Sequence, residues 1–171
     1  MTDPLYRTDP AAWNAHLAEG NARQARKRVS VDALIRDEED RILLVNPTYK
    51  PDWDLPGGMV EANEPLTAAL QRELAEELGI TPAIGALLCV EWVPPRGPWD
   101  DLLAFVFDAG VLDSAALSHV ELIDGELSAY ELCTPGQAEQ RLRPYVYRRV
   151  TTALHALETG QPCYLQDGRL H

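Results

Sequence analysis

The chain has 171 residues, of which 46% are hydrophobic and 25% charged, and its formal net charge is −12. This length suits one compact domain, and no apolar run approaches the roughly 20 residues that cross a bilayer. The acidic charge repels polyanions, which argues against nucleic acid polymers as partners, and we expect no membrane partner either. Met1-Thr2-Asp3-Pro4 lacks the basic and then apolar layout of a secretion signal, so we expect a cytoplasmic protein.

The cysteines support the same expectation. Cys89, Cys133 and Cys163 are three in number and widely spaced. A disulfide framework favours an even count in a shorter secreted chain, and a zinc site favours closely spaced pairs. We therefore expect ordinary thiols in a reducing compartment.

A helix is predicted from residue 9 to about residue 28, with Asp9 as its cap and Pro10 in its first turn. Its loose apolar stripe would pack either on the domain or on a second subunit. The helix ends in a basic run at positions 23, 26, 27 and 28. These cations would either complement the helix dipole or form a small phosphate-steering patch.

The elements that follow alternate between strands and helices. In chain order we expect a strand at 29–35, a polar turn, a strand at 41–45 that completes a hairpin, a loop at 46–54, a helix at 66–78 ended by Gly79, strands at 86–93 and 102–107, a strand at 127–132, and a helix at 137–157 that Pro144 breaks or kinks. We expect one mixed α/β domain over 1–171, with a helical arm (1–28), a catalytic core (29–135) and a C-terminal helix and tail (136–171).

Three glutamates of the helix at 66–78 share one face. At about 100° per residue, Glu73, Glu76 and Glu77 fall within an arc of roughly 100°. Such carboxylates repel one another, and a divalent cation relieves the repulsion, because carboxylate oxygen is the ligand that Mg²⁺ and Mn²⁺ prefer. A solvated acidic face is the alternative for an isolated cluster of this kind.

The residues around the cluster favour the metal site. Gly58, five residues, Glu64, seven residues, Arg72-Glu73-Leu74, one residue, Glu76-Glu77, one residue and Gly79-Ile80 match every fixed position of the Nudix box. The sequence therefore resembles the Nudix hydrolase family over about 23 residues. The resemblance implies an α/β/α sandwich around a mixed β-sheet, here with an added N-terminal helix and a C-terminal helix. It also implies a Mg²⁺ cofactor, with Mn²⁺ as the alternative.

The resemblance assigns roles residue by residue. Glu73, Glu76 and Glu77 match the metal-binding and catalytic glutamates, Gly57 would offer its carbonyl as a further ligand, Arg72 would orient the glutamates, and Glu64 would support the loop or reach the metal through water. Asn63 stands where many relatives carry glycine and tolerates positive φ. A general base is expected from a later loop, with Glu126 favoured over Glu121. The metal or Glu77 itself remains the alternative.

The resemblance also implies the reaction, in which water cleaves a diphosphate and releases a nucleoside monophosphate. Pro95, fifteen residues after Ile80, resembles the pattern of ADP-ribose and sugar-nucleotide hydrolases. Substrate contacts are expected from Arg96, which would clamp a phosphate, and from Trp99, Trp53 and Tyr49, with packing at the rim as the alternative for the two tryptophans. The partner is thus a small nucleoside diphosphate derivative, and a homodimer is expected because relatives often dimerise. The alternatives are a housecleaning pyrophosphatase of the 8-oxo-dGTP type and a non-catalytic nucleotide sensor.

Overall fold

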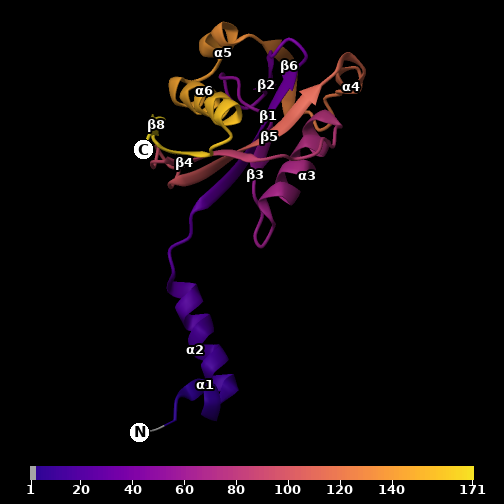
Figure 1. Ribbon diagram of the computed structural model, residues 1–171. Helices are drawn as coiled ribbons and strands as arrows, with labels where there is room; N and C mark the ends of the chain where they lie inside the picture. Colours follow the sequence, from indigo (N-terminus) through magenta and orange to yellow (C-terminus); the bar gives the residue numbers. More distant parts are fainter. Residues whose placement is uncertain (1–2) are drawn as a thin grey trace.

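The computed structural model describes residues 3–171, which form an α/β sandwich with a helical arm (Figure 1). In chain order the elements are α1 (Leu5–Thr8), α2 (Pro10–Arg23), β1 (Arg28–Asp37), β2 (Ile42–Pro47), β3 (Gly57–Met59), α3 (Leu66–Leu78), β4 (Leu87–Val93), β5 (Leu102–Leu112), α4 (Ser114–Leu117), β6 (Leu127–Cys133), α5 (Pro135–Arg141), α6 (Pro144–Thr159), β7 (Cys163–Gln166) and β8 (Arg169–Leu170). No helix among these residues is long and apolar enough to span a membrane.

The strands form one mixed sheet in the order β6-β2-β1-β5-β4-β7-β8, with β3 paired to β1. β1 runs parallel to β5, and β4 runs parallel to β7, while the other pairs are antiparallel. β1 serves two neighbours along one edge, since Val31 lies opposite Gly58 of β3 and Arg36 lies opposite Ile42 of β2. The glycine pair that precedes the acidic helix is thereby held against the centre of the sheet.

Helices α3 and α6 cover opposite faces of the sheet (Figure 1). Successive side chains of a strand point to opposite faces, so Val31 and Ile35 pack toward α3, whereas Leu34 joins the core beside α6. Both cores are fully buried and apolar at their centres. The expected α/β/α sandwich around a mixed sheet is confirmed.

The acidic helix α3 is fixed by its apolar stripe. Leu70, Leu74 and Leu78 are completely buried, and each such side chain contributes about 1.5–3 kcal/mol relative to an exposed one. The helix spans the predicted residues, and Gly79 ends it with a φ of 67°. This anchoring determines which way the glutamates on the adjoining face point.

The N-terminal helix is shorter than expected. Asp9 accepts a hydrogen bond from the Ala12 amide and Pro10 is in the first turn, as predicted, but α2 ends at Arg23 rather than near residue 28. The chain is extended from Gln24, and Arg28 already pairs with Leu102 in the sheet. α1 and α2 project away from the sandwich, so the arm does not pack on the domain (Figure 1). Arg23 therefore lies in the last turn of α2, whereas the rest of the basic run lies beyond the helix.

The C-terminal region contains more structure than the sequence indicated. The break at Pro144 is confirmed, because Arg143 before it has a ψ of 145° and separates α5 from α6. The tail then adds two unpredicted strands, β7 beside β4 and β8 beside β7. Both are short and lack an alternating pattern, as does the glycine-rich β3, which was also missed.

Candidate active site

Arg72 organises the face of α3 that carries the glutamates. Its guanidinium donates hydrogen bonds to both carboxylate oxygens of Glu64, at 3.0 and 2.9 Å, and to Glu73 and Glu76, at 2.9 and 3.2 Å. It also reaches the carbonyl of Met59 at 3.2 Å. The hydrogen bonds from Arg72 and from the Glu61 amide lower the pKa of Glu64 to about 2. One cation thus ties the loop before α3 to two glutamates of the helix.

Glu77 lies deeper than its neighbours and is only 7% exposed. Its Oε2 accepts a hydrogen bond from the Gly57 amide at 3.1 Å. Burial, followed by the nearby carboxylates of Glu73, Asp124 and Glu126, raises the pKa of Glu77 to about 8. Negative charge is therefore concentrated at this point with too few protein cations to balance it.

The donor set fits a hard divalent cation. Within residues 3–171 no three acidic, histidine or cysteine side chains are already gathered as a ready metal site. Glu73 and Glu76 are instead held by Arg72, and Glu77 by Gly57. A Cβ on Gly58 would lie 2.4 Å from the carboxyl carbon of Glu73, so glycine leaves this carboxylate its space. Unbalanced, partly buried carboxylate oxygens of this kind are what Mg²⁺ and Mn²⁺ prefer.

The two candidate bases occupy different positions. Glu126 is exposed on the loop before β6 and is close enough to raise the pKa values of Glu73 and Glu77. Its backbone is fixed, since its carbonyl accepts a hydrogen bond from the Thr48 amide at 2.8 Å. Glu121 lies at the C-terminal end of α3, where its amide donates to the carbonyl of Leu78 at 3.0 Å.

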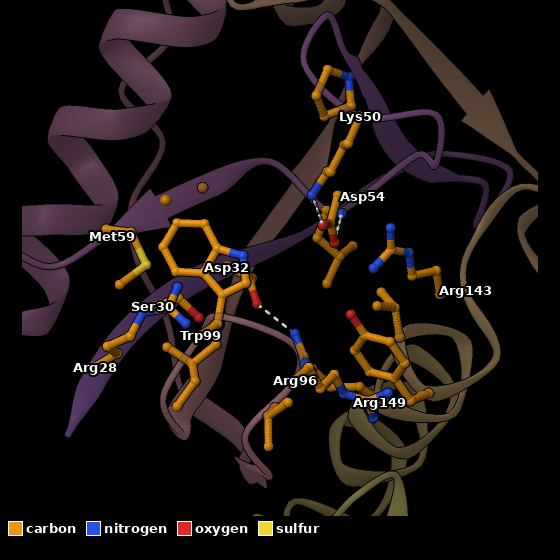
Figure 2. A pocket seen from close by; sticks show the side chains of 18 of the residues that line it. Arg28, Ser30, Asp32, Lys50, Asp54, Met59, Arg96, Trp99, Arg143 and Arg149 are labelled. Atoms are coloured by element: carbon orange, nitrogen blue, oxygen red, sulfur yellow. Dashed lines mark hydrogen bonds and ion pairs between the residues drawn. The ribbon is translucent and has the colours of Figure 1, made fainter.

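A cavity of about 430 Å³ extends from the acidic helix across the sheet to α6 (Figure 2). Its lining includes Glu77, Gly57 and Gly58 and also a set of cationic and aromatic side chains, namely Arg28, Tyr49, Lys50, Arg96, Trp99, Arg143, Tyr145 and Arg149. Tyr49, Arg96 and Trp99, the expected substrate contacts, all line this cavity. Pro94 also lines the cavity, whereas the exposed Pro95 does not.

Trp53 is not among the residues that line this cavity. Its backbone bridges to Leu142, and its ring packs against the core beside α6 with the guanidinium of Arg141 4.9 Å from the ring centroid. This position agrees with packing, the alternative to a substrate contact for this residue.

Most cations of the cavity are paired with carboxylates. Lys50 binds Asp54 at 2.5 Å, Arg96 binds Asp167 at 2.6 Å, and Arg143 binds Asp52 at 2.6 Å. Arg28 differs, because its guanidinium lies 4.5 Å from the centroid of the Trp99 ring and donates to the Asp100 carbonyl. Lys27 pairs with Asp101 in the same loop. The end of the basic run therefore fixes the loop between β4 and β5 and contributes one wall of the cavity.

A buried ion triad forms the floor beside α6. Arg149 donates to Glu91 at 2.5 Å and to Asp32 at 3.1 Å, and these three residues are 5%, 0% and 8% exposed. Burial raises the pKa of Asp32 to about 7, and the charge of Arg149 opposes this shift. Asp32 and Arg149 line the cavity, whereas Glu91 does not.

Comparison with known families decides what this arrangement is. The model of the NUDIX domain matches residues 26–154, most of the chain. The chain belongs to the Nudix family. Its box, from Gly58 to Ile80, is the loop and helix that carry the glutamates described above.

Individual Nudix relatives agree with this assignment. An ADP-ribose pyrophosphatase of Methanocaldococcus jannaschii is 36% identical over 104 residues, which cover 59% of this chain and 54% of that protein. The chain thus matches about half the length of this relative. The MutT protein of Methanosarcina mazei superposes with a TM-score of 0.66 at 26% identity, covering 79% of this chain and 99% of that one. The Nudix domain of Shewanella oneidensis NrtR, solved with ADP ribose, gives 0.65 at 22% identity, covering 82% and 97%. At this identity it supports the fold alone.

Sequence reasoning missed the ion triad beside the Nudix cavity, two of whose members line it. A signal for it was present, because each member is a charged residue inside an apolar segment. Asp32 stands between Val31 and Ala33, and Arg149 falls on the buried stripe of α6 beside Val146 and Val150. A charge at such a position needs a partner. The sequence does not reveal which strand supplies that partner.

Proposed function

We propose that this Nudix protein is a divalent-metal-dependent pyrophosphohydrolase that cleaves ADP-ribose or a similar sugar nucleotide. The products would be a nucleoside monophosphate and a phosphorylated sugar. One observation carries the proposal above all others. Glu77 belongs to the acidic face of α3 and also lines the cavity that is lined by the arginines and Trp99. The carboxylates that suit a metal and the groups that suit a nucleotide therefore face the same space.

The residues in and around the box would have distinct roles in metal binding and catalysis. Glu73, Glu76, Glu77 and the Gly57 carbonyl would hold the ion, and Arg72 would keep Glu73 and Glu76 in position through its hydrogen bonds. When bound, the ion would supply charge neutralisation and a water of lowered pKa. Glu126 would serve as the general base, because it lies near both Glu73 and Glu77.

Other residues that line the cavity would bind the rest of the substrate. Arg96 is held by Asp167 and lies 4.3 Å from the centroid of the Tyr145 ring, a restrained position for a phosphate contact. Trp99 is 62% exposed and Tyr49 is 71% exposed, so both offer ring surface to a base or sugar. The name of the M. jannaschii relative favours ADP-ribose among the sugar nucleotides.

The proposal is tested by turnover with Mg²⁺ of ADP-ribose, a UDP-sugar and 8-oxo-dGTP, carried out in ¹⁸O-labelled water. We expect ADP-ribose to be the preferred substrate and the label to enter only one of the two products. Glu77→Gln should lower kcat by about 100-fold or more, because it removes a charged ligand without changing the size of the side chain. Preference for 8-oxo-dGTP would support the housecleaning alternative. If none of the compounds were hydrolysed, the proposal that the protein is a pyrophosphohydrolase would be refuted.

The base is tested by a matched pair of variants. Glu126→Gln and Glu121→Gln each neutralise one exposed loop acid. We expect Glu126→Gln to lower kcat by about 100-fold, a typical contribution of general base catalysis, and Glu121→Gln to leave kcat nearly unchanged. The reverse result would move the role to Glu121, and two unaffected variants would assign it to the metal or Glu77.

A further inference from the structure

The buried triad contains two carboxylates and one guanidinium. Arg149 donates a hydrogen bond from Nε to Glu91 and another from Nη1 to Oδ2 of Asp32. The other oxygen of Glu91 accepts the Gly168 amide of the β7–β8 turn at 2.7 Å, so both oxygens of Glu91 are used. Among residues 3–171, by contrast, no group donates a hydrogen bond to Oδ1 of Asp32. Oδ1 of Asp32 is therefore the one carboxylate oxygen of the triad that has no donor among these residues.

That acceptor belongs to the residue that faces the cavity. Asp32 lines it, and its strand places it directly opposite Gly57 at the start of the box (Figure 2). Lys50, a nearby cation, is already bound to Asp54 at 2.5 Å, and Figure 2 shows this pair beside that of Asp32 with Arg149. Lys50 is thus paired with Asp54, and Arg149 binds the other oxygen of Asp32.

Among residues 3–171 the buried side-chain atoms without a partner are Arg36 Nε and Arg141 Nε, so Oδ1 of Asp32 is open to water from the cavity. A ligand that displaces this water with a hydroxyl or an amino group restores a hydrogen bond to the carboxylate, whereas a ligand without a donor loses it and a phosphate at the same point adds repulsion. A site built around such an acceptor discriminates strongly against a ligand that lacks the matching donor. The triad therefore has the properties of a selectivity element.

We propose that Asp32 determines substrate specificity by accepting a hydrogen bond from a hydroxyl or amino group of the nucleotide, while Arg149 fixes its other oxygen. This proposal rests on the proposed function and specifies how the same cavity chooses its substrate. It requires the substrate to present a neutral donor, not a phosphate, on the floor of the cavity beside α6. The adenine amino group and the ribose hydroxyls of a sugar nucleotide are the two sources of such a donor.

The test compares ADP-ribose with analogues that each lack one donor, either the adenine amino group or a single ribose hydroxyl. The specificity constant kcat/KM is measured for the parent protein and for Asp32→Ala. The variant should fold, because Arg149 keeps Glu91 and the remaining buried pair is neutral. Asp37→Asn is the matched control, since Asp37 lies on the same strand, is 1% exposed and pairs with Arg41, but does not line the cavity.

We expect one analogue to lose about 10- to 100-fold in kcat/KM with the parent, the range for a hydrogen bond to a charged group. That analogue identifies the source of the donor. Asp32→Ala should lower kcat/KM for ADP-ribose by a similar factor and should no longer distinguish the analogue from ADP-ribose. Asp37→Asn should keep the discrimination of the parent.

Two results would overturn the assignment while leaving the enzyme intact. The first is a parent that turns over every analogue as well as ADP-ribose. The second is an Asp32→Ala variant that loses activity but keeps the same ratio between ADP-ribose and the analogue, which is what a purely structural role predicts. A parent that hydrolyses neither ADP-ribose nor its analogues would instead refute the proposed function, and with it the role of Asp32.

Discussion

Replacing Arg149 with methionine tests whether the ion triad supports the fold as well as the cavity. Arg149 is 5% exposed and is the cation shared by Asp32 and Glu91, which are 8% and 0% exposed. Methionine has a similar length, so little packing is lost, but two buried carboxylates remain without a countercharge. Removing one partner of a buried ion pair costs about 3–5 kcal/mol. For a domain of this size that corresponds to a fall in Tm of about 6–20 °C.

Urea denaturation followed by tryptophan fluorescence gives the free energy of unfolding. Arg148→Met is the matched control, because Arg148 is the exposed neighbour on α6 and, within residues 3–171, its side chain donates only to the Gly168 carbonyl, a contact worth about 1 kcal/mol. The triple variant Asp32→Asn, Glu91→Gln, Arg149→Met should recover most of the loss, since no charge is left in the core. The reasoning is refuted if Arg149→Met is no less stable than Arg148→Met.

Three further predictions concern other parts of the chain. Burial raises the pKa of Asp37, but hydrogen bonds from Arg41 and the Glu39 amide outweigh it and hold this pKa below its ordinary value. When the pKa of a carboxyl is lowered in the folded state, its contribution to stability is fully present above about pH 4, the ordinary pKa of aspartate. That contribution is lost as the pH falls through the folded-state pKa. The Tm deficit of Asp37→Asn should therefore be present at pH 7 and shrink below pH 4; a constant deficit would contradict this. Burial raises the pKa of Cys89 to about 12, and Cys133 is also buried, so only the half-buried Cys163 should react with Ellman's reagent before unfolding. Gly57→Ala places a Cβ 2.1 Å from the Val31 carbonyl at a φ of 139°, so it should lower Tm, whereas Gly20→Ala, with no atom within 4 Å, should not.

The parts of the protein that could be predicted are those with local signals. The apolar stripe of Leu70, Leu74 and Leu78 and the C-terminal Gly79 define α3 from residues a few positions apart, and the structure confirms its bounds. Asn63 has the positive φ of 65° that its place in the box allows. Pro144 separates two helices because proline restricts the residue before it.

The parts that could not be predicted depend on long-range pairing. Asp32 and Arg149 are 117 residues apart in the sequence. They are in contact only because α6 packs on the face of the sheet to which Asp32 of β1 points. The four-residue strand β7 is stabilised by its neighbour β4 and has no pattern of its own. Trp53 and Trp99 both lie in proline-rich loops, and only the fold decides that Trp99 reaches the cavity while Trp53 packs beside Arg141.

The central claim is that the glutamates of α3 hold the divalent ion on which hydrolysis depends. Its most direct test is the initial rate of ADP-ribose hydrolysis as a function of Mg²⁺ concentration, for the parent and for Glu77→Gln. We predict no turnover by the parent in EDTA, a saturable rise with added Mg²⁺, and a rate for Glu77→Gln that stays at least about 100-fold lower at every concentration. Full activity of the parent in EDTA, or superimposable Mg²⁺ curves for the two proteins, would contradict the claim.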